Sequence, residues 1–229
     1  MRLDAKVTVG YFSDGKAITI KNIGDRKKSG RGRRRPELLA AARNHFFTRG
    51  YLGTTIEMVA REAGFSKRTV YLYFKNKDEL FLTVGEEGLL ILRERLESLD
   101  ISGMSVEKAI DFILDVYLRF AAEHPHYFRI IFQEATSEMI SHIPEAFRNR
   151  LEAHERACLG IVVSITERAI AEGIISGIDP WEVATLFWGT VTGIIFLSLG
   201  GSQTVFTRKT REELAKKGVQ FLFEGLRKR

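Results

Sequence analysis

From residue 36 onward, apolar residues recur every three or four positions, which is the period of a helix with one buried face. Leu39, Ala42 and Phe46 show this spacing, and the pattern stops at Gly50, a residue favoured just past a helix C-terminus. Strand patterns are weak here, so we predict an all-α fold. The predicted helices cover residues 36–49, 54–63, 67–74, 78–99, 104–123, 125–139, 144–173, 180–200 and 208–227.

The first three of these helices are short. Thr54-Thr55-Ile56-Glu57 has the pattern of a capping box at the start of the second, and Ser66 is a capping residue for the third. In the third helix Val70 and Phe74 are four residues apart, so both are expected to point inward. A helix, a short turn with glycine and a second short helix form a helix-turn-helix, which places its second helix in the DNA major groove.

The outward residues of that second helix suit DNA. Lys67 and Arg68 can donate to guanine O6 and N7, and the methyl group of Thr69 can touch a thymine methyl. The hydroxyls of Tyr71 and Tyr73 can hold phosphates. A generic basic surface helix would show the same spacing, so spacing alone leaves both interpretations open.

The charge distribution agrees with an anion-binding front. The chain of 229 residues has a formal net charge of +6, which is the sum of two opposite parts. Residues 1–80 hold 18 Lys and Arg against 8 Asp and Glu, whereas the other 149 residues hold 17 against 21. A basic front joined to a mildly acidic back indicates a module for an anionic partner coupled to a second module.

Residues 38–80 resemble the TetR-type transcriptional regulators. The resemblance rests on Ala41-Ala42, Phe46, Gly50-Tyr51, Thr54-Thr55-Ile56, Val59-Ala60, Ala63-Gly64-Phe65-Ser66, Thr69-Val70-Tyr71-Leu72-Tyr73-Phe74 and Lys75-Asn76-Lys77-Asp78-Glu79-Leu80. It implies a three-helix DNA-binding head, a helical ligand-binding body and a homodimer on a palindromic operator. By position, Thr55 resembles a DNA-backbone contact, Lys67, Arg68 and Thr69 resemble base-facing residues, and Tyr71, Tyr73 and Lys77 resemble phosphate-holding residues.

The chain departs from that pattern in its N-terminal extension, residues 1–35. Residues 1–23 alternate weakly, as in a short hairpin or a mobile arm. Residues 24–35 hold seven basic side chains, one acid and three glycines, which predicts a flexible cationic linker. Within it Arg31 and Arg33 are either a clip for a narrow minor groove or a tether to phosphates. We therefore divide the chain into an arm (1–35), a DNA-binding domain (36–81) and an effector-binding and dimerisation domain (82–229).

The larger C-terminal part is rich in aromatic residues. At helical spacing these are ordinary core residues, but some of them can line an apolar pocket between helices. Few charges interrupt the apolar runs, so we expect a hydrophobic or amphipathic effector rather than a sugar or nucleotide. The candidate pocket residues are Phe120, Tyr127, Phe132 and Trp188.

Residues 183–207 carry no charge, which in isolation is typical of a membrane span. Gly200-Gly201 interrupts the run, however, and leaves an apolar core of the length of an ordinary buried helix. Paired with the last helix, it would make half of a four-helix dimer bundle. The interface residues expected for that dimer are Leu186, Gly189, Gly193, Ala215, Val219, Leu222 and Leu226.

Together these features predict a DNA-binding transcriptional regulator, expected to be a repressor released by a small effector. An architectural or effector-independent DNA-binding protein is the alternative. We find no catalytic motif and expect neither enzyme activity nor a cofactor. The single cysteine, Cys158, excludes an internal disulfide, and His124-Pro125-His126 lacks the spacing of a metal site. Since no signal peptide is evident, we expect a cytoplasmic protein with no membrane partner.

Overall fold

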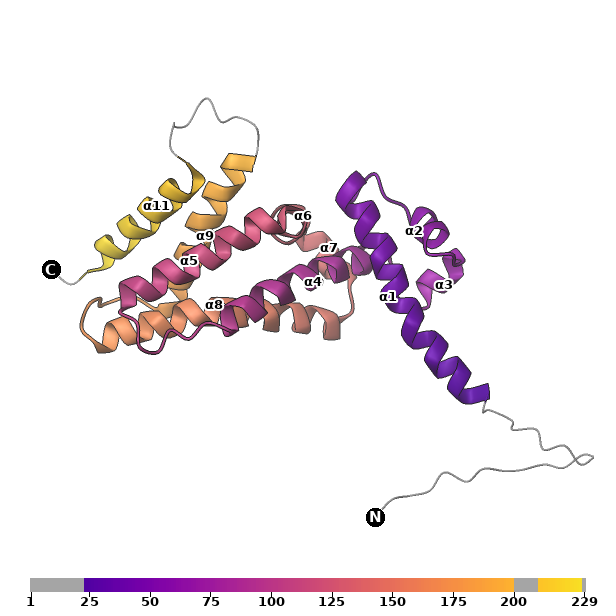
Figure 1. Cartoon of the computed structure of the whole chain (residues 1–229), viewed down its shortest axis with the longest axis horizontal. Coiled ribbons are helices and arrows are strands. Elements are labelled where there is room, and N and C mark those ends of the chain that lie inside the picture. The colour runs from indigo at the N-terminus through magenta and orange to yellow at the C-terminus, as the bar shows by residue number, and fades with distance from the viewer. Residues whose placement is uncertain (1–22, 200–209, 228–229) are drawn as a thin grey trace, which may run out of the picture.

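The computed structural model describes residues 23–199 and 210–227, and these residues are helical apart from the connecting turns. One isolated β-bridge joins Ile175 to Arg227 within the described part. The all-α prediction is therefore confirmed. Figure 1 shows a head of three helices at one end of an elongated helical body, with α4 running from the head into the body.

The head consists of α1 (Ile23–Arg49), α2 (Ile56–Glu62) and α3 (Lys67–Tyr71). The turns between them use Gly50 and Gly64, whose φ angles of +67° and +72° strain any residue with a Cβ. The core of the head is apolar, and its fully buried residues include Phe46, Val70 and Phe74, as the helical spacing predicted.

Two local details of the head differ from the sequence prediction. The helix α1 begins at Ile23 rather than Pro36, so residues 24–35 continue the helix instead of forming a flexible linker. The Lys and Arg residues favour this extension of the helix, whereas the three glycines and Pro36, which has no backbone N–H, oppose it. In α2 the capping residue is Thr55, whose hydroxyl accepts the Met58 N–H, while the buried Thr54 hydroxyl donates to the Gly50 carbonyl.

The body begins with α4 (Lys77–Glu97) and α5 (Val106–Glu123). The region 125–139, predicted as one helix, is three segments: α6 (Pro125–Arg129), a π-helical turn η1 (Ile130–Glu134) and α7 (Ser137–His142). A π turn shifts the helical register by one residue, so a search for a constant 3.6-residue period does not detect it. The remaining helices are α8 (Glu145–Ala171), α9 (Pro180–Leu199) and α11 (Arg211–Leu226).

The helices of the body pack around α4 and α8. α8 packs on α4, α5 and α9, and α11 packs on the other side of α9. Where α11 meets α9, a Cβ on Gly218 would lie 3.1 Å from Thr190 Cγ2, so a glycine permits this close approach. The same core that holds these helices together also reaches into the head through α4.

Candidate DNA interface and effector site

The residues predicted to contact DNA lie together on the head. The Ser66 hydroxyl caps α3 by accepting the Thr69 N–H, which fixes the start of the helix. Lys67, Arg68 and Tyr71 are exposed on α3, whereas Thr69 is half-buried and its hydroxyl lies 3.0 Å from that of Ser66. The other three predicted contacts are Thr55, exposed at the start of α2, and the half-buried Tyr73 and Lys77.

Lys67 has a partner within the head that local sequence patterns did not reveal. Its ammonium forms an ion pair with the Glu57 carboxylate of α2. That hydrogen bond raises the pKa of Lys67 and lowers the pKa of Glu57. A phosphate or guanine that approaches Lys67 must therefore compete with a carboxylate ten residues earlier in the chain.

Lys77, the first residue of α4, also has a partner in the head. Its ammonium lies 4.0 Å from the centre of the Tyr51 ring, a cation–π contact. Partial burial lowers the pKa of Lys77. The Tyr51 hydroxyl donates to the Asp78 carboxylate, and burial together with this carboxylate raises the pKa of Tyr51 to about 12.

The arginines shortly before Pro36 fall into two groups. For Arg31 and Arg33 the structure describes the backbone of α1 but not the side chains. Residues 1–22, which hold the expected hairpin, lie outside the described part. Arg34 and Arg35 contact the head, with their guanidinium carbons 5.8 Å and 5.4 Å from the ring centres of Phe65 and Phe74. The two arginines next to Pro36 thus pack on the helix-turn-helix.

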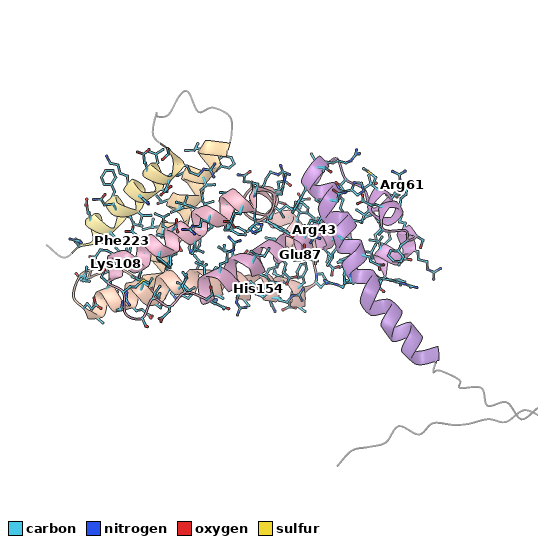
Figure 2. All side chains as sticks on the ribbon, in the orientation of Figure 1. Arg43, Arg61, Glu87, Lys108, His154 and Phe223 are labelled. Carbon is cyan, nitrogen blue, oxygen red and sulfur yellow. The ribbon has the colours of Figure 1, made fainter. Side chains whose placement is uncertain are left out.

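A cluster of three polar side chains joins the head to the body. Arg43 of α1 donates to the Glu87 carboxylate of α4 at 2.9 Å, and the Tyr127 hydroxyl of α6 donates to the same oxygen at 2.9 Å. Figure 2 labels Arg43 and Glu87 where α1 crosses α4. The Tyr127 ring also packs edge-on against Phe47 of α1, with centres 4.9 Å apart.

A second contact joins α7 to the start of α4. His142 Nδ1 lies 2.9 Å from Asp78 Oδ2, and the Asn76 side chain donates to the His142 carbonyl at 3.1 Å. Asp78 therefore links Tyr51 of the head to the last residue of α7. These contacts connect α6 and α7 directly to the head.

The four aromatic residues predicted to line a pocket form two groups in the core. Phe132 and Trp188 both pack on Tyr117, with ring centres 5.8 Å and 4.0 Å from it. Phe120 and Tyr127 both lie near the His124 ring, with ring centres 5.6 Å and 6.1 Å from it. Phe120, Tyr127 and Trp188 are buried, and none of the four lines either of the two cavities described next.

Two of the cavities formed by the described residues lie beside α4. The larger, of about 660 Å³, is an open cleft between the head and α7. The smaller, of about 190 Å³, is lined by residues of α4, η1, α7 and α8 and has a mostly aliphatic wall with charged residues from α4 and α8. Its wall consists of Leu82, Gly85, Glu86, Leu89, Ile130, Ile131, Ala135, Ile140, Arg148, Leu151, Glu152 and Glu155.

Two of the acidic side chains that line the smaller cavity, Glu86 and Glu155, lie in different electrostatic surroundings. Glu86 is buried and accepts two hydrogen bonds from Arg150, at 2.5 Å and 3.2 Å. Burial and the nearby Glu152 raise the pKa of Glu155. The α8 side of the wall therefore combines the apolar Leu151 with two acidic residues, Glu152 and Glu155, and one basic residue, Arg148.

Comparison with known proteins identifies the family. The model described as "Bacterial regulatory proteins, tetR family" matches residues 38–84, and the "Tetracyclin repressor-like, C-terminal domain" matches residues 112–222. Together they span more than two thirds of the chain. The chain belongs to the TetR family.

Individual TetR-family relatives agree with this assignment. The chain is similar to the uncharacterized HTH-type transcriptional regulator YhgD of Bacillus subtilis, with 28% identity over 71% of this chain and 83% of YhgD. It is similar to the HTH-type transcriptional repressor SCO4008 of Streptomyces coelicolor, with 32% identity over 53% of this chain and 60% of SCO4008. The fold resembles that of the regulator PfmR from Thermus thermophilus, with a TM-score of 0.61, 18% identity and coverage of 83% and 99%.

The protein is therefore a DNA-binding transcriptional regulator of the TetR family, whose members are typically ligand-responsive repressors that form dimers. This family is not a class of enzymes. Among the residues that the structure describes, no group of three or more His, Cys, Asp or Glu side chains is placed to hold a metal ion. Burial raises the pKa of the Cys158 thiol to about 12.

The residues predicted for the TetR-type dimer interface fall into two sets: those on α9 are exposed, and those on α11 are buried or half-buried. Leu186, Gly189 and Gly193 share one exposed face of α9 with Phe196 and Leu197. On α11, Ala215 and Val219 are buried and Leu222 and Leu226 are half-buried, in the packing of this helix against the rest of the chain.

In the described part of the chain, one helix segment, Pro180–Leu197 of α9, has the length and apolar composition of a membrane span. Only 33% of that segment is buried within the chain, and its exposed residues include Leu186, Phe196 and Leu197. A core helix of a soluble protein can have the same composition, so the segment alone is weak evidence of a membrane.

Proposed function

We propose that this protein is a cytoplasmic homodimeric repressor that a small effector releases from a palindromic operator. Each head would insert α3 into the major groove of one half-site. In this arrangement Lys67, Arg68 and Thr69 contact bases, while Thr55, Tyr71, Tyr73 and Lys77 contact phosphates. The exposure of the α3 side chains and the excess of basic residues in the first 80 residues support these roles. Arg31 and Arg33 would add contacts in the flanking minor groove or to its phosphates.

The exposed face of α9 supports a homodimer. Around Gly189 and Gly193 no atom lies within 4 Å of the position that a Cβ would take, so nothing in the chain itself requires glycine there. Two copies of α9 can approach closely where small residues are spaced four apart. The same contact would cover the exposed side chains of Leu186, Phe196 and Leu197. This proposal assigns the apolar helix to a protein interface, with no membrane partner.

One observation gives the effector mechanism its main support. The helix α4 lines the smaller cavity and also carries the carboxylate that pairs with the head. Gly85 lines the cavity, and two residues later Glu87 holds Arg43 of α1. We place the effector in this cavity rather than among Phe120, Tyr127, Phe132 and Trp188, because those four rings are packed against neighbouring rings. The aliphatic wall with its acidic edge suits a hydrophobic or amphipathic molecule.

Release would follow from a shift of α4. A Cβ on Gly85 would lie only 2.9 Å from Ile130 Cγ2, so α4 and η1 are in close contact beside the cavity. A molecule that separates these two segments moves α4 and, through Glu87 and Asp78, changes the position of the head. The effector needs a higher affinity for the conformation in which the two heads no longer match the two half-sites.

The test combines a ligand screen with operator binding. The operator is first selected from a random DNA pool, and compounds that raise the melting temperature are then added to the protein–DNA complex. We expect such compounds to weaken operator binding in the parent protein. Ala135→Trp, which fills the cavity, should abolish both effects, while Phe112→Trp on the exposed side of α5 should preserve them. An operator affinity that no stabilising compound changes would instead favour the effector-independent DNA-binding protein.

A further inference from the structure

We propose that Leu72 reads the methyl group of a thymine in the operator, next to the base that Arg68 reads. This inference rests on the proposed function, since it requires α3 in the major groove. Leu72 is 68% exposed, whereas Val70 and Phe74 on either side of it are at most 1% exposed. A single exposed leucine is ordinary on a protein surface. The position of Leu72 on α3 is what gives its exposure a meaning.

Leu72 lies on the same side of α3 as the base-facing residues. It is the C-cap residue, and its φ of −75° and ψ of −19° continue the helical turn. It therefore follows Arg68 by four helical positions and Thr69 by three, the spacings at which side chains are neighbours on a helix surface. Val70 marks the opposite, buried side.

The neighbouring outward positions have other partners. The Lys67 ammonium is paired with Glu57 and lies 5.9 Å from the centre of the Tyr71 ring, so these two side chains form a separate group on α3. Arg68 and Leu72 form the other pair. One of them is a hydrogen-bond donor and the other has only apolar atoms.

The chemistry of the major groove identifies what an aliphatic side chain can recognise there. The base edges in this groove present donors and acceptors, and the C5 methyl group of thymine is their apolar feature. An isobutyl group gains nothing from a donor or acceptor and removes water from it. Leu72 would thus favour thymine at one position in each half-site, beside a guanine that Arg68 contacts.

The experiment removes the methyl group from the DNA and the isobutyl group from the protein. After the operator is selected with the full chain, each thymine is replaced singly by deoxyuridine and the dissociation constant is measured. With the parent protein, we expect about a fourfold loss at one thymine per half-site, the size of one buried methyl group. With Leu72→Ala that thymine becomes insensitive to the replacement, while the effects at other thymines remain.

Two further variants make the result specific. Leu72→Met retains an apolar side chain and should retain the effect. Leu52→Ala makes the same change as Leu72→Ala at a leucine that is 92% exposed outside α3, and it should leave the pattern unchanged. If every deoxyuridine effect persists in Leu72→Ala, the inference is wrong although DNA binding stands. If no operator can be selected, the proposed function fails and the inference fails with it.

Discussion

Gly88 of α4 and Tyr127 of α6 are in direct contact. A Cβ on Gly88 would lie 2.5 Å from the Cβ of Tyr127, so the Tyr127 side chain packs directly on the backbone of α4. This contact holds the Tyr127 ring where its hydroxyl reaches Glu87 and its edge reaches Phe47. The junction between head and body therefore depends on the absence of a side chain at one position.

Replacing Gly88 by alanine is expected to destabilise the protein. The added methyl group forces α4 and α6 apart, and overpacking of this kind costs about 1–3 kcal/mol, more than the roughly 1 kcal/mol that alanine gains in a helix. Urea denaturation at one fixed protein concentration measures the change. Gly160→Ala in α8, where no atom lies within 4 Å, is the control and should be neutral or stabilising. Equal effects of both substitutions would contradict the account of the junction.

The ion pair between Glu57 and Lys67 leads to a second prediction. Glu57→Ala frees the ammonium and removes a negative charge beside the DNA interface, so operator affinity should rise by roughly 2- to 10-fold at low salt. The dependence of affinity on salt should steepen by roughly one ion per half-site, since Lys67 can then pair with a phosphate. Fluorescence anisotropy over a range of salt concentrations measures both.

The matched control for that experiment is Glu62→Ala. Glu62 is a carboxylate of the same helix α2, but its partners are Asn44 and His45. If the two variants bind the operator equally well, the change in net charge explains the result and the release of Lys67 does not.

Local features of the head were predictable from the sequence, because they depend on residues close together in the chain. The Ser66 cap, the inward Val70 and Phe74 and the glycine turns all follow from spacings of three or four residues or from one backbone angle. The partner of Lys67 was not predictable in this way. Glu57 belongs to a pattern typical of a helix cap, and only the packing of α2 on α3 shows its contact with Lys67.

The junction between head and body was beyond sequence reasoning for a similar reason. Tyr127 was expected in an effector pocket because an aromatic residue in a helical body is either core or pocket lining. Its contacts with Glu87 and Arg43 join residues 40 and 84 positions apart. The π turn η1, residues 130–134, packs against α4. It breaks the regular helical period on which the prediction relied.

The exposed face of α9 leads to a prediction about the oligomer. Leucines in place of Gly189 and Gly193 fit the isolated chain, because no atom lies within 4 Å of either Cβ position, but they would hold two copies of α9 apart. We expect the double variant to sediment as a folded monomer at micromolar concentration and to lose most of its operator affinity. Gly160→Leu in α8 should remain a dimer. A double variant that still dimerises would place the interface elsewhere.

The pair of Tyr51 and Asp78 predicts how stability depends on alkaline pH. Burial and the adjacent carboxylate raise the pKa of Tyr51 to about 12, above the value of about 10 that a tyrosine has in an unfolded chain. Because the folded state binds this proton more tightly, the contribution of the phenol to stability is complete below about pH 10 and is lost as the pH rises toward 12.

Tyr51→Phe lacks this contribution, so the free energy of unfolding of the parent should exceed that of the variant at pH 8, and the excess should shrink above pH 10. Urea denaturation at a series of pH values measures the difference, with Tyr71→Phe, an exposed tyrosine of α3, as the control. A difference between the parent and Tyr51→Phe that stays constant from pH 8 to 11.5 would show that the Tyr51 proton is not held by the fold.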